Sequence, residues 1–544
     1  VQAAVPPKAP ATVQAPVPAG VPAQAVAPAP TQPKPPESPL KNPDVLEFTA
    51  RSAKNFPAGY HCAITWGIPT EYGGMTNALL HRSRSFIREA GVPVDVLTFA
   101  WSDKYPDIRR DLEAAAELVP GLRLRNLWEE LAELSPAQLN APKPGNVVEG
   151  GFAPIGQDET SSDEVSGGVL RRRLRYAADQ KTVLQVDYFR PDGSLVVSDR
   201  RDVTVRGAEG GRLVSLCGRD GHPVASWTQI WPLYLFWLDC VVEGRESFMI
   251  VDSKSTANFM TRYRRDNVAT MHLVHNSHMA SGAIPPYGEL SPTRRYVFER
   301  LSSFDAVVLL TGRQKKDVDL VFNNPRNTCV IPNSRSLPEV SSPELGHDPR
   351  LGVILGSLTN RKRLDHAISA VDLARQPGNA EFNLRIYGQG PEEASLRKLI
   401  AARDLDKYVE LAGYSSSARQ EFAGASFTLL TSTLEGQGLV LIEAMSVGCI
   451  PIAYDVPYGP SDIIEHGVNG FLVEAGDISA LAERIRQVGL MDEAALQTMR
   501  RAAFARAHEF NDEIVVQKWG TAMRQAIDRK LSAAVYTPSS KGSI

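Results

Sequence analysis

Two glutamates in the second half of the chain stand eight residues apart, where a strand passes through a turn into a helix. Glu435 lies in the turn and Glu443 lies two turns into the helix, in the stretch EGQGLVLIE. A carboxylate on a mostly apolar helix needs a polar partner, and the hydroxyls of a nucleotide ribose are a natural one. Gly436 and Gly438 let the backbone approach a ligand and leave the helix N-terminus, at Leu439, open toward a pyrophosphate. The stretch favours a nucleotide site over two surface glutamates spaced by chance.

The first half of the chain opens with a similar combination of strand, glycine-rich turn and helix. The apolar run 61–66 predicts a buried strand and the segment 77–89 predicts a helix, with Gly73 and Gly74 in the turn between them. Such a turn lets backbone N–H groups approach a phosphate at the helix N-terminus. Adjacent glycines before a helix are more often a plain turn, so both interpretations remain open.

Two histidines follow a later strand of the same half. His275 ends the predicted strand 270–275, and His278 comes three residues later. Because α/β sheets bind ligands at the carboxyl ends of their strands, we expect His275 to hydrogen-bond a phosphate or a sugar hydroxyl. The alternatives are a structural histidine or a metal pair. A metal site needs further Cys, Asp or Glu ligands at suitable spacing, and the sequence shows none, so no metal site is predicted.

The elements that must position these residues alternate between strand and helix. In the second half, strands are predicted at 351–355, 383–387, 409–413, 426–432 and 450–454, with helices between them. This alternation predicts a doubly wound parallel sheet. In the first half the alternation is interrupted between 169 and 251 by short strand-like runs and turns. One pair of runs, 183–189 and 195–197, predicts a hairpin, so we expect an antiparallel insertion.

The fold class is therefore predicted as α/β, with two Rossmann-like doubly wound domains and a β-rich insertion in the first. The C-terminal stretch is helical by periodicity and is expected to return to the first domain, so that the two domains enclose a cleft. The predicted boundaries are a disordered Pro/Ala-rich tail at 1–45, an N-terminal domain at 55–145 and 252–340, the insertion at 165–251, a C-terminal Rossmann-like domain at 345–515, and a C-terminal helix and tail at 516–544.

Composition narrows the class of protein. The chain has 544 residues, 43% hydrophobic and 22% charged, and these values are typical of a globular protein with more than one domain. A net charge of −3 gives no basic field for nucleic acid. The five cysteines are odd in number and form no CxxC pair, which favours a reducing compartment. No apolar run is long enough for a membrane span, and the start does not resemble a signal peptide.

These motifs together resemble the retaining GT-B glycosyltransferases that carry an E-x7-E motif. Within that family the sequence is most similar to the poly(glycerol-phosphate) and poly(ribitol-phosphate) α-glycosyltransferases of wall teichoic acid. The resemblance covers roughly residues 60–530. It rests on Glu435 with Glu443, Gly448, the segments 454–464 and 469–477, Thr65-Trp66, Gly73-Gly-Met-Thr76, and Val251-Asp252 ahead of the strand that bears His275.

The resemblance implies a role for each matching residue. Glu443 would bind the ribose of a UDP-sugar, and Glu435 would face the transferred sugar. Lys362 would neutralise the diphosphate leaving group, where a fixed cation lowers the barrier. Gly74 would cradle phosphate, and His275 would contact the sugar or the acceptor. The remaining predicted donor-binding residues are Arg363, Gly388, Gly436, Gly438 and Leu439. The family is metal-independent, so no cofactor is expected.

One position departs from the family pattern. Members of the family carry an arginine five residues before the lysine, and here that position is Ser357. A serine hydroxyl cannot replace a bidentate guanidinium on a diphosphate, although Arg361 or Arg363 stands nearby. The departure keeps open a catalytically weakened, glycosyltransferase-like binding subunit as an alternative to an active enzyme.

The acceptor is the second open choice. An anionic polyol-phosphate polymer would favour a basic track, which Arg171–Arg173 with Arg262, Arg264 and Arg265 would supply. The alternative is a Ser/Thr-rich surface protein, as in the related adhesin O-GlcNAc transferases. The expected donor is UDP-glucose or UDP-N-acetylglucosamine. We expect the insertion to serve the acceptor or a homo-oligomer, and the enzyme to be cytoplasmic, with at most peripheral contact at the inner face of the membrane.

Overall fold

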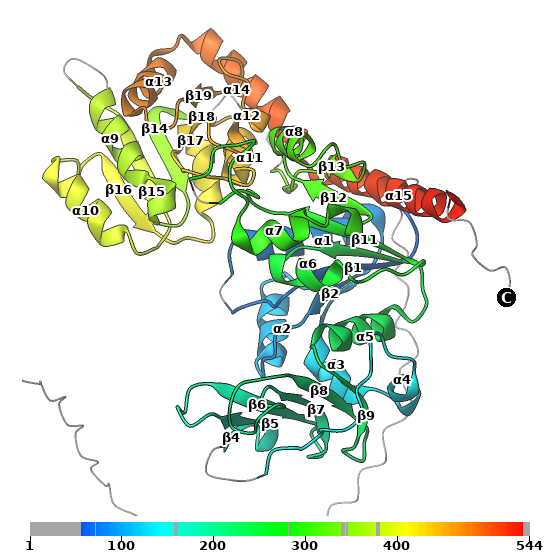
Figure 1. The fold of residues 1–544 in the computed structure, drawn as a ribbon. Helices are drawn as coiled ribbons and strands as arrows, with labels where there is room; N and C mark the ends of the chain where they lie inside the picture. Colours follow the sequence, from blue (N-terminus) through cyan, green and yellow to red (C-terminus); the bar gives the residue numbers. More distant parts are fainter. Residues whose placement is uncertain are drawn as a thin grey trace, which may run out of the picture. The chain divides into compact units, whose positions relative to one another are not determined.

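The structure is a computed structural model that describes residues 56–70, 72–156, 161–280, 282–338, 343, 346–376 and 381–536, without the side chains of 533–536. The predicted tail, 1–45, lies outside the described residues. The described chain contains a seven-stranded sheet, a six-stranded parallel sheet and a six-stranded antiparallel sheet (Figure 1). This arrangement confirms the predicted fold class.

The N-terminal domain is built on the seven-stranded sheet, whose strand pairs are all parallel. Its strand order is β13-β12-β11-β10-β1-β2-β3. The strands are β1 (Tyr60–Thr65), β2 (Val94–Thr98), β3 (Leu122–Asn126), β10 (Ser247–Val251), β11 (Val268–Val274), β12 (Ala306–Leu309) and β13 (Thr328–Val330). The predicted strands at 61–66 and 270–275 therefore exist, with ends shifted by one or two residues.

Helices cover this sheet and lead into its strands. They are α1 (Gly74–Ala90), α2 (Tyr105–Ala114), α3 (Leu127–Glu133), α4 (Pro136–Asn140), α6 (Lys254–Met260), α7 (Pro292–Phe298), the 3₁₀ turn η2 (Leu301–Ser303) and α8 (Gly312–Val321). The long C-terminal helix α15 (Asp512–Tyr536) packs along α1 through Trp519 and Met523 (Figure 1). The chain thus returns to the first domain as expected, but the predicted boundary at 516 falls inside this helix.

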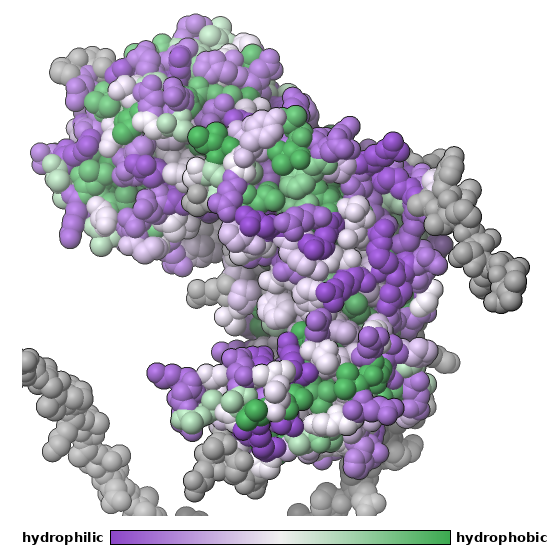
Figure 2. All heavy atoms as spheres, viewed as in Figure 1, coloured by the Kyte–Doolittle hydropathy of each residue, from purple (hydrophilic) through white to green (hydrophobic). Residues whose placement is uncertain are grey.

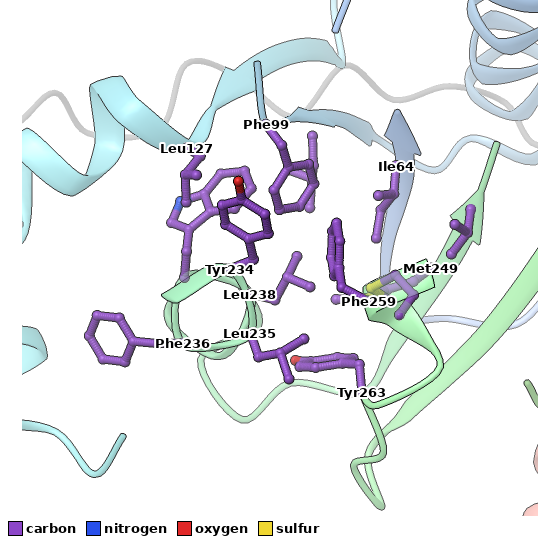
Figure 3. Close-up of a cluster of buried hydrophobic side chains, with 14 of the residues drawn as sticks. Ile64, Phe99, Leu127, Tyr234, Leu235, Phe236, Leu238, Met249, Phe259 and Tyr263 are labelled. Carbon is purple, nitrogen blue, oxygen red and sulfur yellow. The ribbon is translucent and has the colours of Figure 1, made fainter. Parts of the chain in front are cut away.

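The insertion is a six-stranded antiparallel meander in the order β4-β5-β6-β7-β8-β9. Its strands are β4 (Ser161–Ser166), β5 (Val169–Tyr176), β6 (Val183–Phe189), β7 (Leu195–Arg200), β8 (Leu213–Cys217) and β9 (Pro223–Trp227). The predicted hairpin is β6 with β7. The chain then leaves the meander through α5 (Trp231–Val242), whose side chains face Ile64, Phe99 and Phe259 in a shared core (Figure 3).

The structure differs from the sequence analysis at the end of the insertion. The run Ser247–Val251 was assigned to the predicted insertion, 165–251, but it is β10, in the middle of the N-terminal sheet between β1 and β11. All five of its residues are buried. A continuous apolar run is typical of a parallel strand covered on both faces, whereas an antiparallel strand with one exposed face alternates. The assignment of this run to the insertion was therefore wrong, and its continuous apolar pattern already favoured a parallel strand.

The C-terminal domain follows the predicted order of elements closely. Its parallel sheet has the order β16-β15-β14-β17-β18-β19. The strands are β14 (Asp348–Leu355), β15 (Asn383–Tyr387), β16 (Val409–Gly413), β17 (Ala425–Leu430), β18 (Ile450–Tyr454) and β19 (Phe471–Val473). The helices are η3 (Asn360–Lys362), α9 (Leu364–Ala374), α10 (Glu393–Ala402), η4 (Ala418–Gly424), α11 (Leu439–Met445), α12 (Pro460–Ile463), α13 (Ile478–Leu490) and α14 (Glu493–His508).

The described surface mixes hydrophilic and hydrophobic side chains (Figure 2). No helix in the described part of the chain is long and apolar enough to cross a membrane. The five cysteines are all free, and Cys62, Cys217 and Cys449 are buried, as expected for core residues rather than a disulfide framework.

Candidate active site

Lys362 and Glu435 form an ion pair in the C-terminal domain, although 73 residues separate them. The Nζ of Lys362 donates to Oε1 of Glu435 over 2.6 Å. Lys362 ends the turn after β14, and Glu435 lies in the loop between β17 and α11. Because β14 and β17 are neighbouring strands, both residues lie at the same carboxyl edge of the sheet. A side-chain hydroxyl also holds the two turns together, because Thr431 Oγ1 donates to the backbone carbonyl of Lys362. The structure therefore brings together a predicted cation and a predicted carboxylate.

Glu443 is held by two arginines that the sequence analysis did not single out. Its Oε1 accepts from Nε of Arg335 over 2.7 Å, and Nη2 of Arg419 lies 3.0 Å from the same oxygen. Arg335 is 7% exposed, so this contact is sheltered from solvent. A carboxylate on the apolar helix α11 did need a partner, as expected. In this state that partner is a pair of guanidinium groups.

The segment that carries Arg335 is fixed at both sides of that residue. Ser334 and Ser336 each donate a hydroxyl hydrogen bond to the carboxylate of Asp512, at 2.5 and 2.8 Å. The same carboxylate contacts Nε2 of His81 on α1 over 2.7 Å. Asp512 thus ties α15, α1 and the segment between the two domains together, and this arrangement aims Arg335 at Glu443.

His275 is held by a buried carboxylate at the carboxyl edge of the N-terminal sheet. Its Nε2 lies 2.7 Å from Oδ1 of Asp252, which follows the neighbouring strand β10. Asp252 in turn accepts two hydrogen bonds of 2.8 Å from the guanidinium of Arg82 on α1. Burial by itself would raise the pKa of Asp252, but the charge of Arg82 and the hydrogen bonds from His275 and Arg82 lower it to about 2. The carboxylate is therefore ionised and orients the imidazole.

The two groups of residues meet where the loop before α11 touches the end of β11. A Cβ added to Gly436 would lie 2.2 Å from the carbonyl oxygen of His275, so only glycine allows this approach. Next to it, the side-chain amide of Gln437 accepts from the backbone N–H of Asn333 over 2.8 Å and donates to its carbonyl over 3.2 Å. Glu435 and His275 thus lie on segments in direct backbone contact.

The other predicted residues take simpler positions. Gly74 is the first residue of α1, is exposed, and has open space where a Cβ would stand. Gly438 and Leu439 begin α11, and neither this helix nor α1 has a side-chain cap at its N-terminus. Gly388 is required by packing, because an added Cβ would lie 1.9 Å from a backbone oxygen of the neighbouring strand end. Arg363 is occupied locally by Asp365, at 3.1 Å.

Two further residues bear on the open questions. Ser357 is exposed in the turn after β14. His278 is fully buried, with its ring stacked against Phe298 and Tyr458 and its nitrogens without hydrogen-bond partners. His278 thus faces the interior, unlike His275.

Asp252, Arg82, Arg335 and Arg419 complete the site but were not assigned from the sequence. A signal for Arg82 does exist, because it lies on the otherwise apolar face of α1 with Leu79 and Phe86. Arg335 has no comparable pattern, since the chain around it is an irregular segment.

A cavity of about 880 Å³ lies behind Arg335, lined by Arg88, His508, Asn511 and Asp512 among others. It does not include Lys362, Glu435 or His275, so this hollow and the candidate chemistry do not coincide. Across the described ranges, no group of three or more His, Cys, Asp and Glu side chains could hold a metal ion.

Comparisons with known proteins agree with this geometry. Residues 339–506 match the family described as Glycosyl transferases group 1. The chain is 23% identical over 482 residues to a poly(ribitol-phosphate) alpha-N-acetylglucosaminyltransferase of Staphylococcus aureus, covering 82% of this chain and 96% of that protein. It is 24% identical over 540 residues to a poly(glycerol-phosphate) alpha-glucosyltransferase of Bacillus subtilis, covering 89% of this chain and 78% of that protein.

A third relative is the GtfA subunit of a UDP-N-acetylglucosamine–peptide N-acetylglucosaminyltransferase of Streptococcus pneumoniae, 27% identical over 242 residues, which cover 43% of this chain and 47% of that protein.

Solved structures show the same fold. A mutant of S. aureus TarM in complex with fondaparinux, alpha-GlcNAc-glycerol and UDP superposes with a TM-score of 0.67 at 20% identity, covering 86% of this chain and 100% of that one. The pneumococcal O-GlcNAc transferase GtfA in complex with UDP and GlcNAc gives a TM-score of 0.59 at 20% identity, covering 86% and 99%. Residues 339–506 are therefore a glycosyl transferases group 1 domain, and the chain is a glycosyltransferase with the GT-B fold.

Proposed function

We propose that this glycosyltransferase moves a hexose or N-acetylhexosamine from a UDP-sugar to a polyol-phosphate cell-wall polymer, with retention of the anomeric configuration and without a metal ion. The observation that carries the proposal is the contact of Gly436 with the His275 carbonyl, which joins the Lys362–Glu435 pair to the His275–Asp252 pair. Donor and acceptor groups of a transferase have to meet at such a junction of two domains.

The donor half of the reaction uses the C-terminal domain. Glu443 would accept hydrogen bonds from the ribose hydroxyls through Oε2, since Arg335 and Arg419 both engage Oε1. Lys362 would bind the diphosphate, on which negative charge builds as the glycosidic bond breaks. Because Lys362 contacts Glu435 in this state, donor binding would exchange one anion for another at the same ammonium group.

The N-terminal domain would supply the remaining contacts. The free N-terminus of α1 at Gly74 offers backbone N–H groups to a phosphate. His275 would face the sugar or the acceptor through Nδ1, because Nε2 is engaged by Asp252. Ser357 offers no cation, so this enzyme would rely on Lys362 more heavily than a relative with an arginine at that place.

The length of the similarity favours the polymer as acceptor. The two relatives named for polyol-phosphate polymers align with 82% and 89% of this chain, whereas the peptide-directed GtfA subunit aligns with 43%. A Ser/Thr-rich surface protein is the second candidate, because the fold of GtfA also matches across 86% of the chain.

The antiparallel meander is the surface that we propose for a homo-oligomer.

The five free cysteines favour a reducing cytoplasm as the site of the reaction, with contact at the inner face of the membrane at most peripheral.

The test is turnover of UDP-glucose and UDP-N-acetylglucosamine, without added metal, by the full chain and by Glu435→Gln, with purified poly(glycerol-phosphate), poly(ribitol-phosphate) or a Ser/Thr-rich peptide as acceptor. Glu393→Gln is the matched control, because Glu393 forms an exposed ion pair with Arg397 on α10. Transfer to a polyol-phosphate polymer that Glu435→Gln abolishes and Glu393→Gln retains supports the proposal.

Two results would contradict it. Glycosylation of the peptide but of neither polymer would replace the acceptor with a protein. Absence of both turnover and binding for these and other nucleotide sugars would assign the chain to the weakened binding subunits.

A further inference from the structure

Most of the arginines that the sequence suggested for an acceptor track are already neutralised. Four of the six lie within 4 Å of a carboxylate. The pairs are Arg172 with Glu164, Arg173 with Asp163, Arg264 with Asp305 and Arg265 with Asp239. Exposed pairs of this kind contribute little to stability, and their charge is no longer available to attract an anion. Unpaired cations are therefore the more informative feature.

Arg294 is such a cation, and it lies on α7 beside the candidate active site. Its guanidinium has no ion pair or hydrogen bond with any residue in the described part of the chain. Burial lowers its pKa, with no carboxylate to oppose that effect. Arg294 is half-buried, and a charge that is partly removed from water is normally paired, because an isolated one is costly. Arg294 is the exception in this region.

His278 is the second unusual group, and it packs against the same helix. Its ring is fully buried and stacks on Phe298 of α7 with a centroid distance of 5.2 Å. Its carbonyl accepts from the backbone N–H of Ser291, just before α7. Neither ring nitrogen has a hydrogen-bond partner. Burial, followed by the charge of Arg294, lowers the pKa of His278 to about 4, so the ring is neutral and close enough to sense that charge.

Lys254 adds a second cation next to α7. It begins α6, which packs beside α7 (Figure 1). Its Nζ lies 3.4 Å from Oγ1 of Thr293, the residue before Arg294. Lys254 is exposed, and within the described ranges no carboxylate lies within 4 Å of its ammonium group. Two unpaired cations thus come from two adjacent helices.

Lys254 and His278 are both close in the chain to the His275–Asp252 pair. Lys254 follows Asp252 by two residues, and His278 follows His275 by three. The carboxyl ends of β10 and β11, which are paired strands, bring these segments together. A group bound by the cations would therefore lie beside His275, on the N-terminal side of the junction.

We propose that Arg294 and Lys254, with His278 behind them, form a phosphate-binding subsite that holds a phosphodiester of the acceptor polymer. The inference rests on the proposed function, and it deepens that function by naming the residues that recognise the acceptor. A phosphodiester supplies the negative charge that Arg294 lacks, whereas a neutral Ser/Thr-rich peptide leaves the arginine unpaired.

The test compares Arg294→Gln and Lys254→Gln with Arg295→Gln. Arg295 is the matched control because it is the next residue of α7, is exposed, and pairs with Glu289. We expect the KM for poly(glycerol-phosphate) to rise roughly tenfold in Arg294→Gln and less in Lys254→Gln. In both variants, the KM for the UDP-sugar and the rate of donor hydrolysis without acceptor should stay unchanged. The control Arg295→Gln should keep the wild-type KM for poly(glycerol-phosphate). The thermal midpoint of Arg294→Gln should equal or exceed that of the wild type, because a half-buried unpaired charge is removed.

A direct titration separates this proposal from the proposed function. Binding of sn-glycerol 3-phosphate, followed by calorimetry, should be weakened by Arg294→Gln and not by Arg295→Gln, and glycerol should not bind. If wild type binds glycerol phosphate in this way but glycosylates no polymer, the subsite stands and the proposed acceptor is wrong. Equal effects of Arg294→Gln and Arg295→Gln would overturn the subsite. A rise in the KM for the UDP-sugar alone would assign the cations to the donor diphosphate and overturn it as well.

Discussion

The N-terminal domain holds its candidate reactive group through a buried chain of ion pairs, whereas the C-terminal domain holds its carboxylates with cations that keep more exposure to solvent. His275 is oriented by Asp252, and Asp252 by Arg82, all within one domain. Glu435 and Glu443 instead contact Lys362, which lies in another turn, and Arg335, which lies between the domains.

The difference indicates that the N-terminal ion pairs are preorganised, whereas the C-terminal ion pairs are expected to exchange partners. The N-terminal chain is already complete, because the side chain of Asp252 has no exposed surface and its pKa is lowered to about 2. The C-terminal pairs keep some exposure and must change when a donor enters, since Lys362 and Glu443 are both expected to bind it. Preorganised groups favour catalysis, while exchangeable ones allow the donor to bind and leave.

The strongest way to break the comparison is to remove the buried carboxylate. Asp252→Ala leaves Arg82 charged and unpaired in the interior, and we expect the free energy of unfolding to fall by about 3–5 kcal/mol. Urea unfolding measures this loss, with Glu393→Gln expected to change stability by less than about 0.5 kcal/mol. Equal effects of the two substitutions would show that the N-terminal chain is not the rigid element.

Glu435→Gln should do the reverse, with a large effect on activity and a small one on folding. Losing the carboxylate that we propose to face the transferred sugar should lower kcat roughly a hundred- to a thousand-fold, while the unfolding midpoint changes little. Steady-state transfer and urea unfolding of the same preparation measure both. A loss of stability comparable to that of Asp252→Ala would remove the contrast between the two domains.

The burial of His278 in the N-terminal domain can be tested through the pH dependence of stability. Burial and then the charge of Arg294 lower the pKa of His278 from 6.5 to about 4, so the folded state favours the neutral ring. This contribution to stability is complete above the unfolded pKa and is lost as pH falls toward 4. Its slope in that window is about 1.4 kcal/mol per pH unit.

His278→Phe keeps an aromatic ring between Phe298 and Tyr458 but does not titrate. Urea unfolding at several pH values should therefore show a shallower acid dependence in this variant than in wild type. Parallel pH profiles would mean that His278 is hydrated in the folded protein.

The smallest expected effect comes from Arg335, and it tests whether the ion pair at Glu443 exchanges when the donor binds. Arg335→Ala removes one partner of Glu443 but leaves Arg419, so the carboxylate is loosened rather than freed. We expect the KM for the UDP-sugar to rise roughly fivefold, or ~1 kcal/mol, with kcat almost unchanged. A matching fall in kcat would show instead that Arg335 acts on the reacting groups, and Arg335→Lys should restore part of the donor affinity.

Much of the C-terminal domain was predictable because its signals are local. The strands 383–387, 409–413 and 450–454 were predicted with the ends that the structure shows. Each is a run of one periodicity bounded by glycine or polar turns, so its conformation depends little on distant contacts. The prediction for 247–251 failed because this run was grouped with the antiparallel runs before it in the chain, although its continuous apolar pattern is typical of a buried parallel strand.

The sequence by itself determined the two-domain α/β architecture, the antiparallel meander, and the residues Glu435, Glu443, Lys362 and His275 as candidates. It did so because residue types and their spacing are known without the contacts that distant segments make in space. Only the tertiary structure decided which charges meet: Asp252 with Arg82, Glu443 with Arg335, and Arg294 with no carboxylate among the described residues. Ion pairs join segments that are up to hundreds of residues apart, and their energies depend on distance and burial, which no local pattern encodes.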